Sequence, residues 1–225
     1  MGNTNWKARA LTAAVMAGLM GFAAHAEDPM TKQDKEMQKQ GKAVGEAAAK
    51  RVNYVGKLAV FNSRQIKLAT LAEEQATDPQ VKQFATQLRQ DHEKSQEALR
   101  TWAQGQKMQI SELSESDMPS TGTGGSGGVQ QGYDEKMKDT SEKLGKSIDK
   151  TNEELAKLRA KQGPEFDKAF LSRIADDQKM GKDILKEGRK DYKNDATFLA
   201  LLSQTEGVVN SHEMQVKDLE KQMKK

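Results

Sequence analysis

The sequence predicts an all-α fold: an antiparallel four-helix bundle with a long crossover that carries an extra helix. Residue types that favour helices (Ala, Glu, Lys, Gln, Leu and Met) dominate the 225 residues, and aromatic residues make up only 5%. Apolar residues recur at steps of three and four along several long segments, the spacing of one helix face. Roughly 150 structured residues can bury one core, so we expect a single domain.

The N-terminal segment 1–26 has the pattern of a secretory signal peptide. Lys7 and Arg9 give a positive start, residues 11–24 are apolar, and residues 24–26 match a small-x-small cleavage site. The apolar run is shorter than the roughly 20 residues that cross a bilayer, so we expect cleavage and no integral membrane span. The chain has no cysteine that could carry a lipid anchor. These features predict a periplasmic or secreted protein.

The bundle is expected over residues 53–225, after a flexible polar segment at 27–52 with little apolar periodicity. The first helix should run from about Tyr54 to Ala76. Its inward positions are Leu58, Phe61, Gln65, Leu68 and Ala72. Asp78 is a good N-cap residue and Pro79 suits the first helical position, so a second helix begins there. Such a short connection predicts that the two helices are antiparallel.

The second helix should continue to about Ala103, with Gly105 as its stop. Its inward positions are Val81, Ala85, Leu88, His92, Ser95, Leu99 and Trp102. Residues 109–132 are rich in glycine and serine, a composition that predicts a flexible linker. A phosphate-binding loop is disfavoured, because no Gly-Lys-Ser/Thr follows the glycines.

A heptad pattern over residues 133–161 predicts the crossover helix, with coiled-coil character. Its apolar stripe could pack on the bundle, on a second copy of the chain or on a helical partner. The next helix should run from about Glu165 to Gly188, and Asn194 or Asp195 should cap the last one. Inward positions of the last helix are Phe198, Leu201, Thr205, Val208, His212, Val216, Leu219 and Met223.

Polar residues interrupt the apolar stripes of four helices at mid-length, and two of them are histidines. These residues are Gln65, His92, Asp177 or Gln178, and His212. One interpretation is a hydrogen-bonded polar layer of Gln65–His92 and Gln178–His212 pairs that fixes helix register. A second is a single divalent ion, Zn, Fe or Mn, held by the two histidines with Asp91 or Asp177. A third is an acid sensor, because buried imidazoles gain charge as the pH falls.

The chain resembles domain-of-unknown-function family 4142, a ferritin-like family of bacterial envelope proteins. The resemblance covers about residues 58–220 and rests on the stretches 65–72, 81–85 and 163–170 and on the histidine of the last helix. The family pattern has a glutamate on the first bundle helix, Asp-His on the second and third, and a histidine on the fourth. Positions that match are Asp91, His92, Asp177 and His212, whereas Gln65 replaces the glutamate and Gln178 replaces the third-helix histidine.

The resemblance implies a ferritin-like bundle but no particular activity. A di-iron centre is disfavoured, because it needs about four carboxylates and a Glu-x-x-His pair on each of two helices, and neither His92 nor His212 follows a glutamate at that spacing. Without the signal segment the charges nearly balance, 34 basic against 33 acidic, and they are interspersed, which argues against nucleic-acid binding.

We therefore expect an exported, non-enzymatic envelope protein with a structural, stress-related or interaction role and no cofactor. The alternative is a ferritin-like metal-binding or metal-dependent redox protein that uses the two core histidines.

Overall fold

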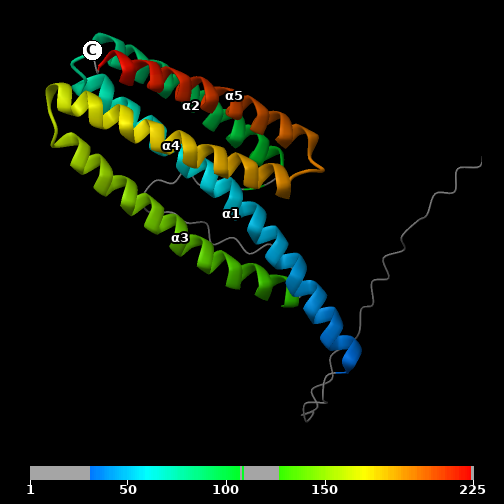
Figure 1. The fold of residues 1–225 in the computed structure, drawn as a ribbon. Helices are drawn as coiled ribbons and strands as arrows, with labels where there is room; N and C mark the ends of the chain where they lie inside the picture. The colour runs from blue at the N-terminus through cyan, green and yellow to red at the C-terminus, as the bar shows by residue number, and fades with distance from the viewer. Residues whose placement is uncertain (1–30, 107, 109–126, 224–225) are drawn as a thin grey trace, which may run out of the picture.

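The computed structural model describes residues 31–106, 108 and 127–223 (Figure 1). This part of the chain is all-α: five helices pack into a bundle, and it contains no strand. The helices are α1 (Lys32–Gln75), α2 (Pro79–Gly105), α3 (Gly127–Arg159), α4 (Gly163–Asp191) and α5 (Ala196–Gln222). The expected signal segment at 1–26 and residues 109–126 of the expected linker lie outside the described residues.

Four of the helices surround the core, and the fifth lies along the outside of one of them. α1 packs against α2 and α4, and α5 packs against α2 and α4 in turn. α3 lies along α1 and touches α4 less extensively. α1 and α3 are parallel, because Gly45 of α1 meets Val129, and Arg64, further along α1, meets Thr151. Figure 1 shows α1 and α3 extending side by side beyond the ends of the other helices.

The helix starts follow the capping signals in the sequence. Asp78 caps α2, accepting hydrogen bonds from the backbone of Gln80 and Val81, and Pro79 takes the first helical position as expected. α2 ends at Gly105, which confirms the predicted stop. Asp195, one of the two expected residues, caps α5 by accepting from the backbone of Phe198.

A second carboxylate holds the turn between α1 and α2 from outside that hairpin. Asp167 of α4, 1% exposed, accepts from the backbone N–H groups of Thr77 and Asp78 at 3.0 and 2.9 Å. The Thr77 hydroxyl donates to the same carboxylate at 2.6 Å. The turn is therefore locked to the beginning of α4 by charge-assisted hydrogen bonds.

Replacing Asp167 with alanine is expected to lower the free energy of unfolding by about 1.5–3 kcal/mol, because the hydrogen bonds lost all ended on a charged group. Urea denaturation followed by circular dichroism measures this change. Asp167→Asn keeps one acceptor oxygen and should lose less. A wild-type free energy of unfolding in Asp167→Ala would show that these hydrogen bonds do not stabilise the fold.

Two boundaries differ from the expectation. α1 begins at Lys32, so most of the segment predicted to be a flexible lead-in at 27–52 is helical, and α3 begins at Gly127, inside the predicted linker 109–132. The two early stretches support each other. A Cβ on Gly45 would lie 2.0 Å from a backbone oxygen of α3, and a Cβ on Gly132 would lie 2.3 Å from one of α1. Only glycine permits so close an approach, and apolar periodicity does not reveal it.

The core consists of two apolar clusters at different heights along the bundle. One gathers Leu68, Leu88, Phe170 and their neighbours, and the other gathers Leu58, Leu99, Phe198 and theirs. Every predicted inward position of α1 and α2 is buried. In α5 the sequence predicted that Val208 would be buried. Val209 is buried instead, and Val208 is half-buried. None of the described helices is long and apolar enough to cross a membrane.

Candidate functional site: a polar layer in the bundle core

Between the two apolar clusters lies a layer of buried polar side chains, which we call the polar layer. Every member is at most 1% exposed. The layer consists of Asn62 and Gln65 on α1, His92 on α2, Asp177 and Gln178 on α4, and His212 on α5. The six side chains thus come from four helices, and all five predicted core positions are among them.

The two histidines face one another. Their ring centres lie 5.4 Å apart with the planes inclined by 42°. Aromatic rings from the adjacent clusters contact the imidazoles edge to face, Phe61 against His92 and Phe84 against His212. The sequence prediction that two helices direct imidazoles into one buried interior region is confirmed.

Each histidine uses one ring nitrogen for a hydrogen bond and leaves the other without a protein partner. His212 Nε2 lies 3.1 Å from Asp91 Oδ2, and His92 Nδ1 lies 3.0 Å from Asn62 Oδ1. His92 Nε2 and His212 Nδ1 are buried and make no hydrogen bond. A carboxylate only accepts, so His212 carries its proton on Nε2. With the amide oxygen of Asn62 facing the ring, the proton of His92 is on Nδ1, and the amide nitrogen of Asn62 has no partner.

Burial makes both imidazoles weak bases. Desolvation, the larger cause, and the nearby His212 together lower the pKa of His92 from 6.5 to about 3. Desolvation also lowers the pKa of His212, although the hydrogen bond to Asp91 and its charge oppose this shift. Both rings are therefore neutral at pH 7, and each nitrogen that lacks a partner presents a lone pair.

The glutamines pair differently from the prediction. Gln65 does not bond to His92, and Gln178 does not bond to His212. Instead Gln178 Nε2 donates to Gln65 Oε1 at 3.1 Å, and Gln65 Nε2 donates to Asp177 Oδ2 at 2.9 Å. The layer therefore has a histidine side and an amide–carboxylate side. The predicted pairs joined residues at similar positions along neighbouring helices. Similar position along the helices does not determine which side chains turn toward each other.

The amide–carboxylate side leads into a closed ring of four charges that joins three helices. Arg64 of α1 bonds to Asp177 of α4 at 2.7 Å and also to Glu154 of α3. Arg173 of α4 completes the ring, 3.0 Å from both carboxylates. The Thr151 hydroxyl accepts a further bond from Arg64 at 3.2 Å. Two positive and two negative groups balance, which is the condition for burying Arg64 at 5% exposure.

Asp177 is therefore committed to cations of the protein rather than free for a metal. Burial raises the pKa of Asp177 from its ordinary value, against the lowering effect of the bonds from Arg64 and Gln65. Of the four residues predicted as ligands, Asp91, His92 and His212 lie together, whereas Asp177 faces Arg64 and Arg173. Within the described part of the chain, no three His, Cys, Asp or Glu side chains form a cluster that could hold a metal ion.

The sequence analysis did not identify Asn62 of the polar layer or Arg64 of the ring of charges. A signal was present: Leu58 and Ala59 precede Asn62 by four and three positions, and Val60 and Phe61 precede Arg64 in the same way. A polar residue with apolar neighbours at these spacings lies on a buried face. The inward face of α1 is wide because α2, α3 and α4 all pack on it.

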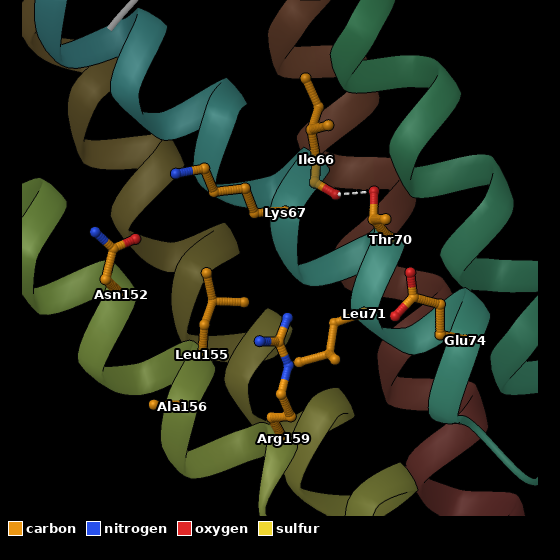
Figure 2. A pocket seen from close by; sticks show the side chains of 9 residues that line it. All are labelled: Ile66, Lys67, Thr70, Leu71, Glu74, Asn152, Leu155, Ala156 and Arg159. Atoms are coloured by element: carbon orange, nitrogen blue, oxygen red, sulfur yellow. Dashed lines mark hydrogen bonds between the residues drawn. The ribbon is translucent and has the colours of Figure 1, made fainter. Parts of the chain in front are cut away.

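A surface pocket of about 420 Å³ lies elsewhere, between α1 and α3 (Figure 2). Leu71 and Leu155 contribute apolar surface, and Lys67, Glu74 and Arg159 contribute charged groups. None of its lining residues belongs to the polar layer. The pocket therefore provides no access to the histidines.

Comparison with known proteins identifies the family alone. No curated protein and no solved structure matches this chain significantly. A family model described as a domain of unknown function, DUF4142, matches residues 35–219. That match includes all five helices and every residue of the polar layer. The chain belongs to the DUF4142 family.

Proposed function

We propose that this protein is an exported, non-enzymatic helical bundle of the bacterial envelope, ferritin-like in its four core helices, whose role is structural and based on association. The signal-like segment 1–26 supports export, and the charge-balanced interior supports a role other than catalysis. The single observation that carries the association is an uncovered apolar stripe on the part of α1 that extends beyond the bundle.

This extension, which we call the arm, consists of residues 32–50 of α1 and the beginning of α3. At about 1.5 Å per residue, the 44 residues of α1 span about 66 Å, whereas the 27 residues of α2 span about 40 Å. Tyr192, at the end of α4, reaches α1 at Arg51, where its hydroxyl donates to the backbone oxygen. On the N-terminal side of Arg51, the described helix that packs against α1 is α3. The two helices meet at Gly45 and through a Lys42–Glu135 ion pair.

The apolar stripe lies on a face of the arm that α3 leaves open. Met37 and Val44, one heptad apart, are 59% and 61% exposed, unusually high for large apolar side chains. Gly41 and Ala48 fill the intervening positions, so the stripe has heptad spacing and small residues. One heptad beyond Ala48, after the exposed Arg51, the same face carries Val55, which is buried in one cluster with Leu99 of α2.

A second copy of the chain is the occupant that this stripe fits best. A stripe of alternating large and small residues is self-complementary across a two-fold axis. The expectation that segment 133–161 provides the association surface is not supported, because Leu144 and Leu158 of that stripe are buried within the chain itself. Leu144, for example, lies against Gly56 of α1.

Association predicts a concentration-dependent dimer that a charge on the stripe disrupts. Analytical ultracentrifugation of the wild-type protein should show a monomer–dimer equilibrium, and Val44→Glu should weaken it at least tenfold, about 1.4 kcal/mol. Ala43→Glu places the same charge on an exposed residue about 100° around the helix from Val44, and it should leave the equilibrium unchanged. A wild-type monomer mass at every concentration would refute association through the arm.

A further inference from the structure

We propose that the two core histidines form a binding site for one transition-metal ion, ligated by His92 Nε2 and His212 Nδ1. This inference goes beyond the structural role, and it differs from the ion site expected from the sequence because it excludes Asp177 and gives Asp91 a supporting role. It rests on two buried nitrogen atoms that the protein leaves without hydrogen bonds.

The first step is that both nitrogens are ligands in the required protonation state. A metal ion needs the lone pair of a neutral imidazole. The bond of His212 Nε2 to Asp91 and the bond of His92 Nδ1 to Asn62 place the protons on the opposite nitrogens. Both free lone pairs are thus fixed by the fold before any ion arrives.

The second step is that the partners of the two rings match those that support metal-bound histidines. Such a histidine almost always donates its other N–H to a carboxylate or carbonyl oxygen, which orients the ring and raises its basicity. His212 has the carboxylate of Asp91 in this position, and His92 has the amide oxygen of Asn62. A histidine that is buried only for packing does not require this combination, in which one ring nitrogen has an oriented acceptor for its N–H and the other nitrogen has no hydrogen-bond partner.

The third step is the spacing. An ion bonded to imidazole nitrogen at about 2.0–2.1 Å lies about 3 Å from the ring centre, so two rings that share one ion have centres about 5 Å apart at a tetrahedral angle. The observed separation is 5.4 Å. Water can complete the coordination. Imidazole nitrogen as the main ligand suits zinc, copper, nickel or iron.

The test uses the full chain, purified without a histidine tag and stripped of metal with a chelator. Zinc chloride added in a calorimeter should bind with one site per chain, and cobalt(II) should give a visible absorption band. His92→Gln and His212→Gln should each abolish stoichiometric binding. Asn62→Ala and Asp91→Ala, which keep both ligands but remove their hydrogen-bond partners, should weaken zinc binding about 10–100-fold.

Two controls separate specific binding from incidental effects. Glu93→Gln and Asp176→Asn each remove an exposed acid beside the polar layer; both variants should bind zinc as the wild type does. Circular dichroism establishes that each variant is folded. The absence of zinc and cobalt binding by the folded wild-type protein would overturn the proposal and assign the two lone pairs to a buried water. Binding that survives both histidine substitutions would overturn it as well.

Discussion

Asp177→Ala should lower the free energy of unfolding by about 3–5 kcal/mol, the largest effect that we expect from a single substitution. Asp177 is 1% exposed and neutralises Arg64, which is also buried, at 5% exposure. Without the carboxylate, Arg64 keeps only Glu154 as an anionic partner, and Gln65 Nε2 loses its acceptor. Chemical denaturation monitored by circular dichroism measures the loss.

A double variant distinguishes an uncompensated charge from lost packing. Removing both members of a buried ion pair and filling the space with apolar side chains is often neutral or stabilising. Arg64→Met combined with Asp177→Leu should therefore be more stable than Asp177→Ala alone. If the double variant were as unstable as the sum of its single substitutions, charge compensation would not be the reason for the loss.

The second large effect is a loss of stability on mild acidification. The folded-state pKa of His92 is about 3, whereas the unfolded chain has the ordinary value of 6.5, so the unfolded chain binds the proton first. Stability is therefore complete above about pH 6.5 and falls as the pH decreases toward 3. At about 1.4 kcal/mol per pH unit, His92 alone costs about 2 kcal/mol between pH 6.5 and 5. His212, whose pKa is also lowered, acts in the same direction.

Thermal unfolding of metal-free protein at several pH values measures this dependence. Two kcal/mol corresponds to a decrease of about 4–8 °C in melting temperature for a chain of this size. His92→Gln retains a side chain that can bond to Asn62 but does not titrate, so its melting temperature should depend less on pH than that of the wild type. Asp177, whose pKa is raised, acts in the opposite sense as the pH falls and is present in both proteins. Identical pH profiles would exclude His92 as the cause.

This pH dependence bears on the acid-sensor interpretation of the sequence. The histidines titrate unfavourably because they are buried among uncharged groups: Phe61 and Phe84 pack against the rings, the imidazoles lie beside each other, and Asn62, which bonds to His92, is neutral. Asp91 faces His212 from the opposite nitrogen. Protonation would thus open the polar layer rather than strengthen a contact, and acid would loosen the bundle. A bound metal ion would oppose protonation by occupying the same lone pairs.

The residues of the polar layer could be predicted individually, but their partners could not. Period-3.6 spacing places Gln65, His92 and His212 on buried faces, since a helix fixes which residues share a side. The spacing carries no information on the rotation of one helix against another. That rotation turns Gln65 toward Asp177 and brings Asn62 to His92.

The sequence by itself determined the all-α class, the positions of the helix ends near Asp78, Gly105 and Asp195, and the presence of two imidazoles in one core, because capping and periodicity act within a single helix. The tertiary structure alone decided that α3 runs parallel to α1 through glycine contacts, that Arg64 is buried within a ring of charges, and that the two imidazoles lie side by side with one unpaired nitrogen each. Each of these depends on groups from different helices. Their free energies depend on distance and burial, which are defined only once the helices have packed.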